Sequence, residues 1–235
     1  MDFQSGLIDQ SVPINIHFDP KQNVLLLIFG GLAQMIGMSF FEFNKTTSGL
    51  GRVNKIFLRD THRSWYHHGL PAVGTGIDDI ETFLQHYTTH PSTRKTIIIG
   101  NSGGGYAALL FGHILGADEV HSFSPKTFIN PIKRIINNDI PPKYSIAHLF
   151  RLYLHGQRKY FDLKKVFLAS APQKRNFHIY FAENSRTDYL QAIRMQSVPG
   201  IHLHPFQHDR HNLIKLLKRR GKLREILEQA ILFSE

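Results

Sequence analysis

The stretch that decides the fold reads Thr96-Ile97-Ile98-Ile99-Gly100-Asn101-Ser102-Gly103-Gly104-Gly105-Tyr106. An apolar run leads directly into Gly-x-Ser-x-Gly, and the helix-forming run 107–110 follows at once. This order predicts a strand, a sharp turn and a helix, with the Ser102 hydroxyl projecting from the tip of the strand. The glycines let the helix approach the strand and leave room for an acyl group beside the serine. We therefore predict that Ser102 is a nucleophile.

This segment has two other interpretations. In a chain with 18 glycines the pattern can arise by chance as a structural turn. Residues 103–108 also match the Gly-x-Gly-x-x-Ala dinucleotide fingerprint, which belongs in the first βα turn with an acid about 20 residues on, at the end of the next strand. Several expected strands come earlier here, and Asp118 and Glu119 precede the next strand, so the context argues against a dinucleotide site.

Length and composition favour a single domain over residues 1–235, because 235 residues with 42% hydrophobic content can bury one sizeable core. No segment reaches about 18 consecutive apolar residues, and the first residues lack the pattern of a secretory signal. The chain has no cysteine, which excludes a disulfide framework, a thiolate metal site and a cysteine nucleophile. We expect a cytoplasmic location.

The formal net charge of +10 predicts a surface that attracts anions. The basic residues are dispersed and no nucleic-acid-binding motif is evident, which argues against nucleic acid. An anionic substrate, a phosphorylated acyl donor such as a coenzyme A thioester, and an anionic membrane surface explain the charge equally well. The basic, amphipathic run 215–224 is either a packed surface helix interrupted near Gly221 or a peripheral contact with the inner face of the membrane.

Short apolar runs alternate with helical patterns along the chain. The expected strands are 12–18, 24–29, 53–58, 96–99, 120–123, 177–181 and 201–206, and residues 78–87 have helical spacing. This alternation predicts an α/β fold with a doubly wound, mostly parallel sheet. Residues 127–173 interrupt the rhythm with prolines and an aromatic, basic stretch. We predict a helical insertion over the carboxyl edge of the sheet, serving as a lid or substrate platform, or a packed excursion that does not touch substrate.

A serine hydroxyl needs a base that takes its proton and an acid that orients that base. After a turn of this kind the acid and the histidine follow the serine in that order, behind the last strands. His211 lies where the loop after 201–206 enters a helix, and Asp188 lies in the loop after 177–181. We predict Ser102, Asp188 and His211 as the catalytic set. The weaker alternatives are His208 as the base and Glu183, Asp209 or Asp60 as the acid.

Two backbone N–H groups are expected to bind the oxyanion of the tetrahedral intermediate. Gly103, directly after the nucleophile, supplies one, and Gly31, in the loop after strand 24–29, supplies the other. The alternative for the Gly30-Gly31 pair is a simple tight turn. No histidine and carboxylate spacing indicates a metal site, and no permanently bound cofactor is expected.

These residues, in this order, resemble the α/β-hydrolase superfamily over most of the chain. A closer resemblance, to a bacterial branch of surface-polysaccharide biosynthesis that includes capsule O-acetyltransferases, rests on Phe29-Gly30-Gly31, Phe57-Leu58-Arg59-Asp60 with Trp65-Tyr66, and Ser122-Phe123-Ser124-Pro125-Lys126. It implies transfer of an acetyl group from acetyl-coenzyme A, as co-substrate, through an acyl-serine to a sugar hydroxyl. The superfamily's usual His-Gly oxyanion pair is Phe29-Gly30 here, which leaves the exact oxyanion donor open.

Three functions are therefore compatible with the sequence. Hydrolysis and acyl transfer share the acyl-enzyme and differ in whether water or a bound hydroxyl attacks it. We favour a Ser-His-Asp O-acetyltransferase acting on a polysaccharide or other carbohydrate, ahead of a carboxylic ester hydrolase. The third function is a glycan- or protein-binding relative without catalysis. The acyl length, the acceptor and the oligomeric state are not encoded in any recognisable pattern.

Overall fold

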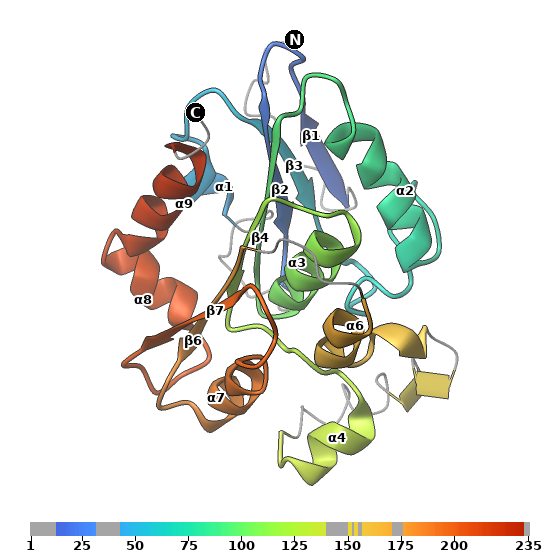
Figure 1. Cartoon of the computed structure of the whole chain (residues 1–235), viewed down its shortest axis with the longest axis vertical. Coiled ribbons are helices and arrows are strands. Elements are labelled where there is room, and N and C mark those ends of the chain that lie inside the picture. The colour runs from blue at the N-terminus through green and yellow to red at the C-terminus, as the bar shows by residue number, and fades with distance from the viewer. Residues whose placement is uncertain are drawn as a thin grey trace.

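The computed structural model describes residues 13–31, 43–139, 150–151, 153–154, 157–170 and 176–232. These residues build a seven-stranded sheet in the order β1-β3-β2-β4-β5-β6-β7 (Figure 1). The strands are β1 (Ile14–His17), β2 (Val24–Phe29), β3 (Asn54–Leu58), β4 (Lys95–Asn101), β5 (Glu119–Phe123), β6 (Phe177–Ala182) and β7 (Ile201–Phe206). Strand β1 pairs antiparallel with β3, and the remaining pairs are parallel. The expected doubly wound, mostly parallel sheet is confirmed; residue 12 of the first expected strand lies outside the described residues.

Helices cover both faces of the sheet. The described helical segments are α1 (Asn44–Thr47), α2 (Ile77–Thr88), α3 (Gly103–Ile114), α4 (Pro131–Ile136), η1 (Arg158–Tyr160), α6 (Leu163–Ala169), α7 (Arg186–Ile193), α8 (Leu213–Arg219) and α9 (Lys222–Leu232). In Figure 1, α1, α8 and α9 lie on one side of the sheet, and α2, α3 and α6 lie on the other. Alternate residues of β2 therefore enter two separate cores, which is why the whole strand is apolar.

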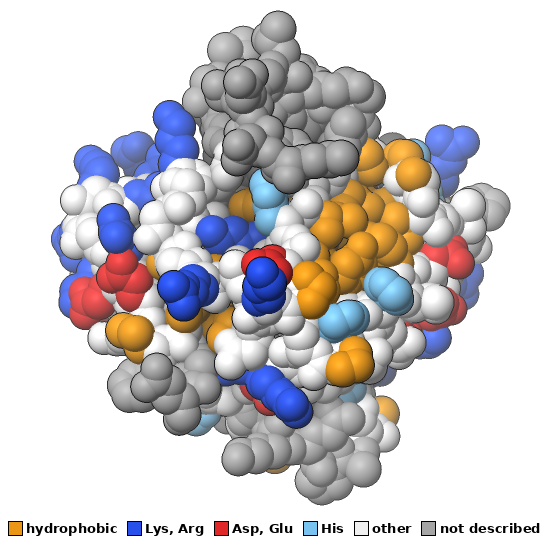
Figure 2. Space-filling model, turned by 90° about the horizontal axis from the view of Figure 1, so that it is seen from above, with side chains coloured by type: hydrophobic (Ala, Val, Ile, Leu, Met, Phe, Trp, Pro, Cys, Tyr) orange, Lys and Arg blue, Asp and Glu red, His pale blue; other side chains and the backbone are white. Residues whose placement is uncertain are grey.

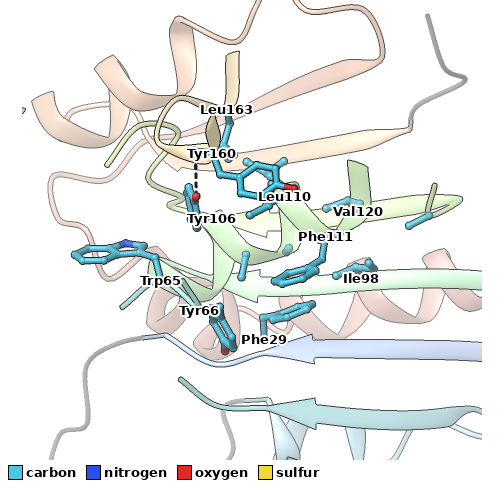
Figure 3. Packing of buried hydrophobic residues seen from close by; sticks show 14 of the residues in the cluster. Phe29, Trp65, Tyr66, Ile98, Tyr106, Leu110, Phe111, Val120, Tyr160 and Leu163 are labelled. Carbon is cyan, nitrogen blue, oxygen red and sulfur yellow. Dashed lines mark hydrogen bonds between the residues drawn. The ribbon is translucent and has the colours of Figure 1, made fainter. Parts of the chain in front are cut away.

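The described part of the insertion 127–173 is helical and joins the main core. Leu163 and Phe167 of α6 are fully buried, and the Phe167 ring stacks on His113 of α3 with centroids 4.6 Å apart. The Tyr106 hydroxyl of α3 donates to the Tyr160 carbonyl oxygen at 2.8 Å (Figure 3). Residues 140–149, 152, 155–156 and 171–173 lie outside the described residues. Whether the insertion covers substrate stays a prediction.

The basic run at the C-terminal end forms two helices. Helix α8 ends at Arg219 and α9 begins at Lys222, with Gly221 between them at φ 69°. This break lies where the sequence predicted it, because glycine adopts a positive φ without steric cost. In the part of the chain that the structure describes, no helix combines the length and the apolar character needed to cross a bilayer. Lys and Arg side chains are more prominent than Asp and Glu on the face that Figure 2 shows, as the net charge of +10 requires.

Candidate active site

Ser102 occupies a strained turn between β4 and α3. Its backbone has φ 54° and ψ −111°, a combination that a non-glycine residue rarely adopts. The surroundings hold it there: the Ser102 N–H donates to the Phe123 carbonyl oxygen at 2.8 Å, and the Tyr106 N–H donates to the Ser102 carbonyl oxygen at 3.0 Å. The strand, turn and helix expected from the sequence are therefore present around this serine.

The glycines around Ser102 permit a close approach of α3 to the sheet. A Cβ atom on Gly104 would overlap the carbonyl groups of Phe29 and Gly30, and one on Gly100 would overlap the Gly104 carbonyl. No larger residue fits either position without moving backbone. As a result, the first turn of α3, which contains Gly103, lies against the loop that contains Gly30 and Gly31.

The three residues predicted as a catalytic set meet in a continuous line of hydrogen bonds. Ser102 Oγ lies 2.8 Å from His211 Nε2, and His211 Nδ1 lies 2.7 Å from Asp188 Oδ1. A carboxylate can only accept, so Nδ1 carries the imidazole proton and Nε2 is free to accept from the serine hydroxyl. The Asp188 side chain is buried and the His211 side chain is 42% exposed. This is the arrangement that lets a histidine act as the base for a serine.

Asp188 is kept in its charged form although it is buried. Burial alone would raise its pKa; the hydrogen bond and charge of His211, together with the charge of Lys126, outweigh it, and the pKa of Asp188 lies below its ordinary value. The structure places Asp188 in the first turn of α7, not in the loop where the sequence put it. The helix begins at Arg186, two residues before the acid, and no pattern in the sequence marked that start.

The alternative bases and acids contact other residues than Ser102 and His211. His208 Nε2 lies 2.9 Å from Asn212 Oδ1, and the Asp209 carboxylate is largely exposed beside Arg210. Glu183 accepts a hydrogen bond from Gln207 Nε2. Asp60 is buried in another loop. Of the candidates named from the sequence, the structure brings together Ser102, His211 and Asp188.

Asp60 organises the loop that follows β3. Its Oδ2 accepts the Ser64 N–H at 2.6 Å and the Tyr66 N–H at 3.0 Å. Three non-glycine residues of this loop, Arg63, Trp65 and Tyr66, have φ values between 53° and 66°. Burial raises the pKa of the Asp60 carboxyl, against the opposing effect of these N–H donors. The carboxyl thus compensates for backbone strain in the loop, a role that the sequence analysis did not consider.

This loop carries Tyr66 to the candidate oxyanion loop. The Tyr66 hydroxyl lies 3.0 Å from both the Gly30 and the Leu58 carbonyl oxygens, while its ring packs against Phe29 (Figure 3). The Gly30 C=O and the Gly31 N–H belong to one planar trans peptide and point in opposite directions. A contact that holds the Gly30 oxygen therefore also orients the Gly31 N–H. The sequence offered one signal of this role, the Asp60, Trp65 and Tyr66 cluster that carried the closer resemblance.

No group of three or more His, Asp or Glu side chains within the described ranges could hold a metal ion. The expectation that the reaction needs no metal is based on the chemistry of the predicted catalytic residues. Ser102, His211 and Asp188 supply a nucleophile, a base and an orienting carboxylate without further groups.

Known proteins of similar structure were found, but no family model and no curated protein matches the sequence. The capsule O-acetyltransferase of Neisseria meningitidis serogroup A is similar over 88% of this chain and 87% of its own, with 14% identity and a TM-score of 0.62. The fluorophosphonate-binding serine hydrolase F of Staphylococcus aureus is similar over 91% and 83%, with 15% identity and a TM-score of 0.56. Est1E from Butyrivibrio proteoclasticus is similar over 94% and 95%, with 11% identity and a TM-score of 0.56. At these low identities, the similarity to each of these proteins concerns the fold alone.

Proposed function

Starting from the α/β-hydrolase fold that the chain adopts, we propose that it is an acyl-transfer enzyme with Ser102 as the nucleophile. The observation that carries the proposal is the unbroken line of hydrogen bonds from Asp188 through His211 to a serine held at φ 54°. Strained backbone at the end of a buried strand is costly, and it recurs where it positions a reacting group.

The proposed reaction uses groups of this chain alone. As Ser102 Oγ bonds to the acyl carbonyl carbon, its proton passes to His211 Nε2, and the buried Asp188 carboxylate stabilises the resulting imidazolium. The carbonyl oxygen becomes an oxyanion, for which the Gly103 and Gly31 N–H groups are the proposed donors. His211 then gives its proton to the leaving group as the carbon–leaving group bond breaks. The product is an acyl-serine.

For the second half of the reaction, we favour attack by a carbohydrate hydroxyl and acetyl-coenzyme A as the donor. The capsule O-acetyltransferase shares the fold along most of this chain, and the net positive charge suits a phosphorylated donor or an anionic glycan. Hydrolysis of a carboxylic ester is the second candidate, favoured by the serine hydrolase of Staphylococcus aureus, which shares the fold over 91% of this chain. In either reaction His211 takes the proton of the attacking hydroxyl or water and returns it to Ser102 Oγ as the acyl–serine bond breaks.

Fluorophosphonate labelling tests the nucleophile. The probe forms a covalent bond with an activated serine, so we expect it to label the wild-type protein and not the Ser102→Ala variant. Ser48→Ala changes an exposed serine outside the site and should be labelled like the wild type. An unlabelled wild type, or equal labelling of Ser102→Ala, contradicts the proposal and favours a non-catalytic binding protein.

Thiol release from acetyl-coenzyme A separates transfer from hydrolysis. Because the chain has no cysteine, a thiol-reactive dye reports the released coenzyme A without a background signal from the protein. For a transferase we expect a glycan acceptor to accelerate release and to appear acetylated in the mass spectrum. Equal release with and without acceptor, with free acetate as the product, favours the esterase.

A further inference from the structure

A basic pocket is formed by the loop that carries His211 and by helix α8. It has a volume of about 640 Å³, and its lining includes His208, Arg210, Asn212, Lys215, Lys218 and Arg219. His208, Arg210 and Asn212 belong to the loop that carries His211, and Lys215, Lys218 and Arg219 lie on the exposed side of α8. The His211 side chain does not line the pocket, but the residues on either side of it in the chain do.

The positive charge of this pocket is poorly compensated. Asp209 is the one acidic residue in the lining, and its carboxylate lies 3.8 Å from His208 Nδ1 and 3.9 Å from Arg210 Nε. Within the described ranges, no carboxylate lies within ion-pair distance of Lys215, Lys218 or Arg219. Cations held close together without counter-charges create a field that concentrates anions.

The basic surface continues past this pocket. Lys218 also lines a second pocket, of about 320 Å³, together with Lys45 and Arg224. Arg224 has a partner there, since its Nε lies 2.7 Å from Glu228 Oε1. Because the two pockets share Lys218, basic side chains extend from the His211 loop along α8 to Lys45 and Arg224.

We propose that the pocket between the His211 loop and α8 binds anionic groups of the substrate, phosphate or carboxylate, while the acyl group is at Ser102. This inference rests on the proposed acyl transfer and adds to it the place where the charged part of the substrate is held. Lysine and arginine side chains bind phosphates and carboxylates through charge-assisted hydrogen bonds. The anionic groups belong either to a phosphorylated acyl donor or to an anionic glycan acceptor.

A soluble anion fits α8 better than a membrane surface does. A helix that lies on a bilayer inserts an apolar face between the lipids. The apolar side chains of α8, Leu213, Ile214 and Leu217 among them, are buried in the protein core. The exposed side of this helix therefore offers charge without an apolar face.

Two soluble probes distinguish the two sources of the anion. Adenosine 3′,5′-bisphosphate carries phosphates like those of a nucleotide acyl donor, and an oligogalacturonate carries the carboxylates of an acidic glycan. We expect titration calorimetry of the wild-type protein to detect binding of at least one of them. The combined variant Lys215→Gln, Lys218→Gln and Arg219→Gln should bind that probe at least about tenfold more weakly, because charge-assisted contacts are lost.

A second combined variant serves as the control. Lys21→Gln, Arg94→Gln and Lys165→Gln removes the same amount of charge from exposed positions outside the pocket. It should bind the probe as the wild type does, which separates a local site from the effect of net charge. Circular dichroism melting of both variants checks that they are folded.

Each outcome decides the proposal. Binding of the bisphosphate alone assigns the pocket to the donor, and binding of the oligogalacturonate alone assigns it to the acceptor. Equal losses in the two variants, no binding of either probe, or binding only to vesicles of anionic phospholipid overturns the proposal. The measurement needs no turnover, so pocket-dependent binding by a protein that fluorophosphonate does not label would leave the anion site standing and the acyl-transfer proposal refuted.

Discussion

At the scale of single residues, the Asp188–His211 contact fixes which nitrogen of the imidazole faces Ser102. Replacing the carboxylate by an amide, Asp188→Asn, keeps the size of the side chain but allows its NH₂ group to face Nδ1. This favours the wrong tautomer, in which Nε2 carries the proton and cannot accept from serine. We expect kcat for 4-nitrophenyl acetate to fall by about 10⁴-fold, the effect known for serine proteases. A fall of less than tenfold in a folded variant contradicts the proposed role.

The Tyr66 hydroxyl allows a second test at this scale. Tyr66→Phe keeps the ring contact with Phe29 and removes the hydroxyl beside the Gly30 carbonyl. If the Gly31 N–H binds the oxyanion, kcat should fall by about 10- to 100-fold with little change in KM, which is less than the roughly 10²–10³-fold cost of deleting a donor. Tyr87→Phe, on α2, is the matched control. A lower melting temperature with unchanged kcat would assign Tyr66 a structural role only.

At the scale of elements, the packing of α3 against the end of β2 depends on a single position. Gly104→Ala places a methyl group where the Phe29 and Gly30 carbonyls lie, so backbone must move. We expect the free energy of unfolding in urea to fall by about 1–3 kcal/mol, the usual cost of overpacking. Activity should fall as well, because the same shift separates Ser102 from the Gly31 loop.

A control for this variant is Gly51→Ala. No neighbouring atom lies within 4 Å of the added methyl group at that position, which is exposed and free of a positive φ. Its unfolding midpoint should match that of the wild type. A Gly104→Ala protein of wild-type stability and activity would show that α3 and β2 adapt to the added atom without cost.

At the scale of the whole molecule, histidine rings connect three strands on the α8 face of the sheet. The His178 ring of β6 stacks on His121 of β5 and on His202 of β7, with centroids 5.0 Å and 5.1 Å away. Its Nδ1 lies 2.9 Å from His204 Nε2. Burial and the neighbouring imidazoles lower the pKa of His178 to about 4, although Glu119 acts in the opposite direction. The surroundings of His178 in this row of histidine rings therefore favour its neutral form.

Acid should therefore destabilise the fold. Between pH 6.5 and about 4 the unfolded chain binds a proton at His178 and the folded chain does not, so the free energy of unfolding falls as the pH falls through this range. The titratable groups around His178 are Glu119, His121, Tyr180, His202 and His204, and Lys95 is paired with Glu119. Urea midpoints at pH 7, 6 and 5 measure the effect.

The variant His178→Gln tests the origin of this pH dependence. It removes the group that protonates only on unfolding, so its urea midpoint should fall less steeply with acid than that of the wild type. His86→Gln, at an exposed position of α2, should keep the wild-type slope. An unchanged slope in His178→Gln would show that other groups cause the acid sensitivity.

The sequence predicted best those elements that are determined by residues close together in the chain. A strand buried on both faces must be apolar throughout, so 24–29 was located residue for residue. The bounds 201–206 also match β7, an edge strand that is only partly buried. Expected helix 78–87 differs from α2 by one residue at each end. The start of α7 at Arg186 and the hydrogen bonds of Asp60 to the Ser64 and Tyr66 N–H groups were not predicted from the sequence. The Asp60 contacts are short-range, but they lie in a loop whose φ values follow no regular pattern.

By itself, the sequence determined that a serine sits in a glycine-lined turn between a buried strand and a helix, because Gly100 to Gly104 dictate that geometry locally. The sequence also reduced the candidates for the base and the acid to a few residues, because these must follow the last strands of the sheet. Only the tertiary structure decided which of 15 histidines meets Ser102, and that Tyr66 meets Gly30. The reason is physical: His211 is 109 residues from Ser102, and the order β4-β5-β6-β7 brings the carboxyl ends of these parallel strands to one edge of the sheet.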